Sequence, residues 1–278
     1  MNARLLFILL LFTIGALWYI IGYWRRKAGE AAFAAARLTE KSEERERYCR
    51  LAVMAGHREA CRMFCLLHPE RFDGHSPHKP FKLRGIRISF YGYYYPSRYN
   101  ALLNDEQKAF CHSIYQFKQG DIHGIEFFKT CMNALQLKKR PYHIMFMPCS
   151  NWIKYGQRFK RLDWYIGKHR QDLTSGLYDV DICDARESLH EAKGGEKRIL
   201  ERNYLITGKI KGKEIIIIDD VLTTGQSVVD YKEEIERCGG KVVAAIFYGK
   251  TLSMPSMLLV QIHVWGNHIT HIIERMTK

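Results

Sequence analysis

The chain has 278 residues, of which 47% are hydrophobic and 26% are charged, and it shows no repeat of fixed period. This composition excludes a disordered or fibrous chain and fits one sizeable globular domain with a short additional module. The formal net charge of +14 favours anionic partners such as phosphate esters, nucleic acid or an acidic membrane surface, without distinguishing among them. The eight cysteines show no paired spacing, so a reduced, intracellular protein is the simplest interpretation.

The N-terminal segment is the most apolar part of the chain. Residues 5–24 are almost wholly apolar, and about 20 such residues are needed to cross a hydrocarbon core of roughly 30 Å. Small residues at 31–36 support a secretory signal peptide as the alternative, but the run is long and its basic cluster follows it. We therefore expect a single-pass transmembrane anchor over residues 1–27. Because basic residues concentrate after the span, the rest of the chain is expected in the cytoplasm.

A helical connector and linker are expected over residues 28–80. Residues 30–68 have a helical composition with a break near Gly56, and prolines and glycines between 69 and 80 mark the linker. Four potential metal ligands fall roughly along one helical stripe: His57, Cys61, Cys65 and His68. Their apolar neighbours favour buried packing of the cysteines over a metal site.

Residues 81–278 alternate short apolar runs with helical segments, which is typical of an α/β domain with a doubly wound parallel sheet. The expected strands cover residues 86–93, 143–147, 179–183, 214–218, 241–248 and 258–265. The clearest expected helices cover residues 104–118, 121–137 and 227–238. The expected fold class is therefore α/β, and the transmembrane helix and the connector are expected to precede the α/β domain in the chain.

The most informative segment begins with four consecutive isoleucines at residues 215–218. Such a run predicts a central strand buried on both faces, because a half-exposed strand would alternate. Ligands of doubly wound folds bind beyond the carboxyl ends of the strands, where the next residues fall. These residues are Asp219, Asp220, Val221, Leu222, Thr223, Thr224, Gly225, Gln226 and Ser227.

The residue types in this loop suit a ribose 5-phosphate. Hydroxyl groups, a glycine and the free N–H groups of a helix start can together hold a phosphate. Asp219 and Asp220 can accept hydrogen bonds from vicinal ribose hydroxyls and can stabilise a cationic centre. An acidic turn with a Ser/Thr helix cap is the alternative, but the order of the whole string favours the binding site.

This ordered string resembles the phosphoribosyl pyrophosphate (PRPP) motif of type I phosphoribosyltransferases. Residues 143–161 resemble the ComF-like branch of that family, in which a strand ending in proline precedes a loop and an arginine-containing element. The resemblance implies a pyrophosphate loop formed by Cys149, Ser150 and Asn151, with Arg158 after it. Further similarity to the branch is carried by Arg202, Asn203, Gly212 and Lys213.

The resemblance implies an enzyme that transfers phosphoribose from PRPP to a nitrogen nucleophile and releases pyrophosphate, with Mg²⁺ bound together with PRPP. Asp219 and Asp220 would then be catalytic, stabilising an oxocarbenium-like transition state. No dedicated protein cage for the metal is expected. The leaving group would be neutralised by Lys154, Arg158, Lys160 and Arg161, although a solvent-exposed basic helix is the alternative for these four.

Other functions and features stay open at this point. A glycine-containing basic stretch at residues 193–198 could be a flexible cover of the site or a solvated loop. Aromatic residues at 90–95 could stack an acceptor base, although core packing is favoured. The alternative functions are a non-catalytic module that senses PRPP or a nucleotide, and a membrane-tethered, competence-related protein that handles nucleic acid.

Overall fold

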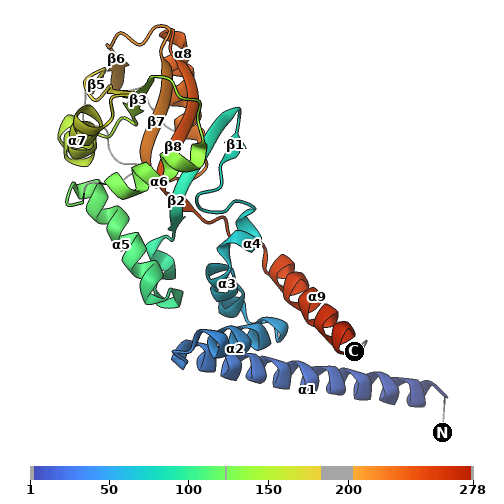
Figure 1. Ribbon diagram of the computed structural model, residues 1–278. Helices are drawn as coiled ribbons and strands as arrows, with labels where there is room; N and C mark the ends of the chain where they lie inside the picture. The colour runs from blue at the N-terminus through green and yellow to red at the C-terminus, as the bar shows by residue number, and fades with distance from the viewer. Residues whose placement is uncertain (1–2, 123, 183–202, 277–278) are drawn as a thin grey trace. The chain divides into compact units, whose positions relative to one another are not determined.

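The computed structural model describes residues 3–122, 124–182 and 203–276 (Figure 1). The chain divides into two compact units. The first, here called the helical unit, combines Met1–Gly74, Tyr99–Leu103 and Ser253–Lys278. The second, here called the sheet unit, combines His75–Arg98 and Asn104–Leu252. This division differs from the expected boundaries at residues 27 and 80, since it joins the C-terminal segment to the N-terminal helices.

The helical unit begins with helix α1, Ala3–Leu38, which continues without interruption past residue 27. Among the residues that the structure describes, no helix is both long and apolar enough to cross a membrane. The transmembrane helix expected over residues 5–24 is therefore not supported. The side chains of residues 5, 6, 8 and 9, which belong to the expected span, lie outside the described part.

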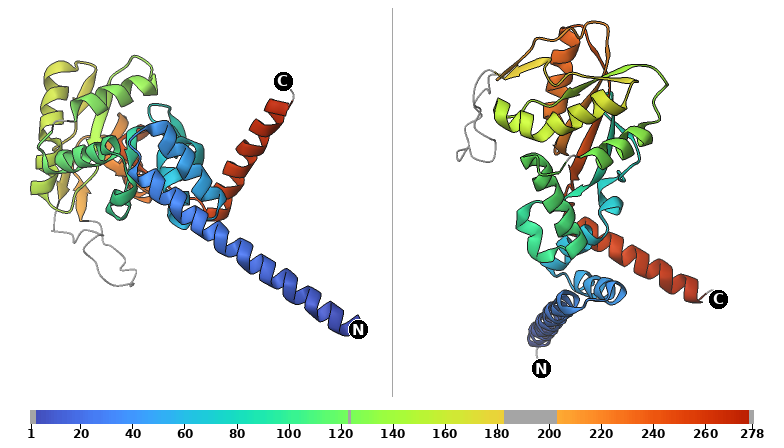
Figure 2. Two further views of the ribbon diagram at one scale, coloured as in Figure 1. Left: turned by 90° about the horizontal axis from the view of Figure 1, so that it is seen from below. Right: turned by 60° about the vertical axis from the view of Figure 1, so that its left-hand side comes forward.

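Residues 30–68 were expected to be helical, and two further helices, α2 (Ser42–Met54) and α3 (Arg58–Leu67), follow α1 there (Figure 1 and Figure 2). The break between them contains Gly56 with a φ of +89°, a conformation that glycine adopts without strain. Cys61 and Cys65 are 2% and 1% exposed, so the expected buried packing of these thiols is confirmed. A short helix, α4 (Pro69–Asp73), follows, and Ser97–Leu102 form a 3₁₀ turn.

The prediction of a strand over residues 258–265 is wrong, because this segment lies within helix α9, Met257–Met276. Its apolar residues recur at intervals of three or four along the whole helix, a spacing that a window of eight residues does not separate from a strand. Val260 and Val264 are buried, and Gln261 Nε2 donates to the Val53 carbonyl oxygen at 3.4 Å. The C-terminal helix is therefore packed within the helical unit.

The sheet unit is built on a six-stranded sheet in the order β1-β2-β8-β7-β3-β4. Its strands are β1 Phe81–Leu83, β2 Ile86–Tyr94, β3 Tyr142–Phe146, β4 Leu173–Ser175, β7 Glu214–Leu222 and β8 Lys241–Thr251. Only β1 pairs antiparallel, and the other neighbours are parallel. The mainly parallel sheet confirms the predicted α/β class. Strand β5 (Val180–Ile182) instead pairs antiparallel with β6 (Tyr204–Ile206) in a separate small sheet.

Helices cover the sheet as a doubly wound arrangement requires, with α7 and α8 on opposite sides of it (Figure 1). Helices α5 (Asp105–Gln119), α6 (Ile125–Leu135) and α7 (Trp152–His169) pack one core with Ile216 and Ile218 of β7. On α8 (Gln226–Arg237), Ile235 approaches Gly240 together with Ile215 of β7. The side chains of neighbouring isoleucines therefore pack on opposite faces of the sheet, and because helices cover both faces, all four are fully buried.

Aromatic residues of β2 and the turn after it pack into the core of the sheet unit. Phe90, Tyr93 and Tyr95 are 0%, 6% and 5% exposed. This burial agrees with the favoured interpretation and leaves these rings little surface for stacking an acceptor base.

Candidate active site

The acidic pair lies at the carboxyl end of β7, as predicted, but within the strand and not in a loop after it. The strand was expected to end at Ile218, whereas pairing with β8 continues through Asp219, opposite Phe247, to Leu222, opposite Lys250. Leu222 is 3% exposed, so its side chain belongs to the core. Val221 is half-buried, and its N–H donates to Asp220 Oδ1 at 2.5 Å. These two apolar residues therefore belong to the strand and not to the turn that follows it.

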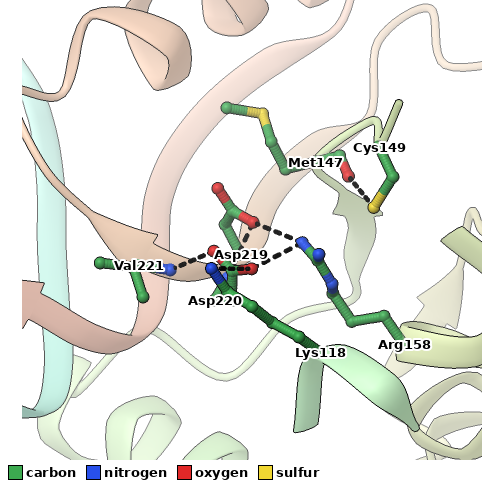
Figure 3. Close-up of polar contacts among 7 residues, drawn as sticks. All are labelled: Lys118, Met147, Cys149, Arg158, Asp219, Asp220 and Val221. Atoms are coloured by element: carbon green, nitrogen blue, oxygen red, sulfur yellow. Dashed lines mark hydrogen bonds and ion pairs between the residues drawn. The ribbon is translucent and has the colours of Figure 1, made fainter. Parts of the chain in front are cut away.

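Two cations from different helices meet the acidic pair (Figure 3). Arg158 of α7 places Nη1 2.7 Å from Asp220 Oδ2 and 3.7 Å from Asp219 Oδ1. Lys118 of α5 places Nζ 3.4 Å from the same Asp220 oxygen. The side chains of Arg158, Asp219 and Asp220 are only 15%, 14% and 10% exposed. Two carboxyl groups and two cationic groups therefore face one another in a site that is largely shielded from solvent.

Burial has a direct effect on the protonation of this cluster. Burial, followed by the neighbouring charge of Asp220, raises the pKa of Asp219 to about 7, although Arg158 opposes the shift. For Arg158, burial acts to lower the pKa, but the carboxylates of Asp220 and Asp219 outweigh it, so the net pKa is raised. The arginine is therefore a permanent cation, while the Asp219 carboxyl can gain or lose a proton near neutral pH.

The turn after β7 is open to solvent and leads into α8. Thr223, Thr224 and Ser227 are exposed, so their hydroxyl groups are accessible to a ligand. No side chain caps the N-terminus of α8, where Gly225 is the N-cap residue. The N–H groups of a first helical turn have no intrahelical acceptors and form a favourable anion site. This part of the predicted loop therefore has the groups that a phosphate needs.

The side chain of Gln226 is committed elsewhere. Arg84 Nη1 donates to its Oε1 at 2.6 Å, and its own Nε2 donates to Asp230 Oδ1, also at 2.6 Å. Its backbone N–H lies 3.4 Å from Thr224 Oγ1. Of the predicted loop residues, Gln226 therefore offers a ligand its backbone rather than its amide group.

Replacing Gly225 by alanine is expected to lower the free energy of unfolding by about 1–3 kcal/mol, because a positive φ and a close contact would coincide. Gly225 has a φ of +78°, and a Cβ there would lie 2.2 Å from Leu83 Cδ2. Urea denaturation measures the change. Gly212→Ala is the matched control, since its φ is +76° with nothing within 4 Å of the added carbon. Equal losses in the two variants would show that the approach of Leu83 is unimportant.

The predicted pyrophosphate loop lies beside the acidic pair, after β3. The Met147 N–H donates to the Ile218 carbonyl oxygen at 2.9 Å, which ties the start of this loop to β7. Asn151 caps α7 by accepting from the Lys154 N–H at 2.9 Å. Ser150 is half-buried. Burial raises the pKa of Cys149 to about 12, so this thiol stays protonated and is unsuited to act as a nucleophile.

Asn203 contacts the predicted pyrophosphate loop through its side chain. Its Nδ2 donates to the carbonyl oxygens of Cys149 at 3.2 Å and Ser150 at 3.4 Å, and the residue is 7% exposed. The sequence indicated Asn203 only through the family resemblance and did not predict this positioning contact. Arg202 and the basic stretch at residues 193–198 lie outside the described residues.

The structure separates the four basic residues that were expected to neutralise the leaving group. Arg158 reaches the acidic pair, whereas Lys154, Lys160 and Arg161 lie on the exposed side of α7. The position of these three residues agrees with the alternative interpretation, a solvent-exposed basic helix. Lys118 was missed, because a single lysine near the end of an amphipathic helix carries no sequence signal of its own.

Comparison with known proteins supports the class of protein that this fold and site suggest. Residues 171–251 match the family model described as a phosphoribosyl transferase domain. The matched segment contains the acidic pair and the turn before α8, and the mainly parallel sheet fits the type I phosphoribosyltransferase fold.

A curated relative supports the same family. The orotate phosphoribosyltransferase of Sulfolobus acidocaldarius is 42% identical to this chain over 57 residues, which are 20% of this chain and 26% of the relative. The chain thus spans about a quarter of the length of the relative that it matches. Neither match distinguishes the ComF-like branch, which stays a prediction.

Proposed function

We propose that this chain binds PRPP through residues 219–227 and transfers its phosphoribosyl group to a nitrogen nucleophile with release of pyrophosphate. One observation carries the proposal: a buried acidic pair lies near the carboxyl end of a central parallel strand and is followed by two further strand residues, an open turn and an uncapped helix start. The turn suits the 5-phosphate, and the acids suit the ribose hydroxyls and the positive charge that develops on the ribose ring. The matched family and the orotate phosphoribosyltransferase relative support this general activity.

In the proposed reaction, the bond between ribose C1 and the pyrophosphate oxygen breaks while a bond from C1 to the nucleophile nitrogen forms. Arg158 and Lys118 then neutralise the leaving group, to which Arg158 can donate from Nε. That atom is buried and has no hydrogen-bond acceptor among the residues that the structure describes. The attacking nitrogen loses a proton, and Asp219, with a pKa of about 7, is suited to accept it.

Mg²⁺ would bind at this site together with PRPP. Within the described part of the chain, no group of three or more His, Cys, Asp or Glu side chains is arranged to hold a metal ion. Asp219 and Asp220 offer the oxygen ligands that Mg²⁺ prefers, and this ion usually keeps several waters and substrate oxygens. When bound, it would supply neutralisation of the pyrophosphate charge.

Calorimetric titration of the full chain with PRPP and Mg²⁺ tests the proposal. Asp220→Asn and Thr224→Ala are each expected to weaken binding by about tenfold or more, because the first removes a charged acceptor for the ribose hydroxyls and the second removes a hydroxyl that can bind the phosphate. Glu233→Gln is the control, since Glu233 is an exposed carboxylate further along α8. Equal affinities of all four proteins would contradict the assignment.

Pyrophosphate release, measured with a panel of nucleobases and amines, then separates an enzyme from a sensor. Release with at least one acceptor supports the transferase. PRPP binding that is lost in Asp220→Asn, without release for any acceptor, would favour a sensing module.

A further inference from the structure

A second cleft of the sheet unit lies on the outer face of α7 and has a volume of about 460 Å³. It is bounded by the end of α5, by α7 and by the turn after β4. The chemically distinctive residues of its lining are Trp152, Gln157, Lys160, Arg161 and Tyr178. None of these belongs to residues 219–227, and the volume is within the usual range of roughly 300–1,000 Å³ for small-molecule sites.

Two aromatic rings of this cleft are exposed to solvent. Trp152 is 41% exposed and Tyr178 is 66% exposed, and their ring centroids are 6.1 Å apart with an interplanar angle of 44°. The Trp152 ring packs against the buried Tyr155 ring, and their centroids are 5.5 Å apart. A supported, exposed indole beside a phenol ring is a surface on which a planar aromatic ligand can stack.

The same cleft carries positive charge. Helix α7 has five lysine and arginine residues and one aspartate, and Arg158 is already committed to the acidic pair. Lys160 and Arg161 are exposed on the cleft side. Cations of this kind attract a phosphate group. The Gln157 side chain adds an amide that can both donate and accept hydrogen bonds.

We propose that this cleft is a second ligand site and that it takes a mononucleotide. The base would stack on Trp152 and Tyr178, and the phosphate would lie against Lys160 and Arg161. The site is separate from the PRPP site proposed above, but the same two helices serve both. Helix α7 carries Arg158 and α5 carries Lys118 to the acidic pair, while Gln157 and Gly120 of these segments line the cleft. A nucleotide bound here would thus contact the helices that position both cations.

Calorimetric titration of the full chain with adenosine 5′-monophosphate (AMP) tests this site, with adenosine and inorganic phosphate as separate titrants. AMP is expected to bind at least ten times more tightly than either part alone. Lys160→Glu and Tyr178→Ala should each weaken AMP binding by about tenfold or more. Lys168→Glu is the matched control, because it makes the same charge change on α7 outside the cleft and should leave AMP binding unchanged.

Asp220→Asn separates this site from the PRPP site, since it should retain AMP binding while losing affinity for PRPP. Thermal melts of each variant show that it is folded. The proposal is overturned if AMP does not bind the wild-type chain, if Lys168→Glu weakens AMP as much as Lys160→Glu does, or if Asp220→Asn abolishes AMP binding. Binding of a single-stranded oligonucleotide in the absence of AMP binding would also overturn it and would indicate a nucleic-acid surface.

Discussion

Replacing Arg158 by alanine is expected to lower the free energy of unfolding by about 3–5 kcal/mol at pH 7. The variant would leave the largely buried Asp220 carboxylate with Lys118 as its remaining cation among the residues that the structure describes, and removing one partner of a buried ion pair leaves an uncompensated charge. Urea denaturation at pH 7 measures the loss. Such a loss would show that Arg158 stabilises the site in the absence of a ligand.

Two further variants show whether the ion pair causes this loss. Lys154→Ala, on the exposed side of the same helix, should change stability by less than about 0.5 kcal/mol. Adding Asp220→Asn to Arg158→Ala should recover part of the lost stability, because it removes the charge that the first substitution left unpaired. A small loss in Arg158→Ala, or no recovery in the double variant, would contradict the role of the ion pair.

Replacing Asp219 by asparagine is expected to stabilise the protein at pH 8 and to have little effect near pH 4. The pKa of Asp219 is raised from its usual 3.8 to about 7, so the folded state binds this proton more tightly than the unfolded state does. Stability of the wild type should therefore fall as the pH rises from about 4 to about 7, where the buried carboxyl ionises. The gain in the variant at pH 8 is on the order of 2–4 kcal/mol.

Unfolding free energies at several pH values between 4 and 8 test this expectation, with Glu233→Gln as an exposed control that should show no such trend. A difference between Asp219→Asn and the wild type that stays constant over this range would refute the raised pKa. The stabilised variant should also release less pyrophosphate, since strained or unfavourable groups at functional sites commonly trade stability for activity.

The features predicted well from the sequence are those whose signal is local. The isoleucine run at residues 215–218 identified the central strand because only burial on both faces explains four such residues in a row. The amphipathic helices α5 and α8 were found for the same kind of reason, since the periodicity of their apolar residues lies within one segment. Residues 258–265 were misassigned because a short apolar window fits either a strand or a buried helix.

The candidate site also has a part that the sequence predicts and a part that only the structure shows. The sequence by itself determined the central strand and the string from Asp219 to Ser227, because chain order alone places acids, a turn and a helix start in succession. Only the tertiary structure decided that the acids lie within the strand, that Arg158 and Lys118 pair with them, and that Asn203 binds the predicted pyrophosphate loop. These contacts join residues that are distant in the chain, and no local pattern encodes which distant side chains the packing of α5 and α7 brings to one end of β7.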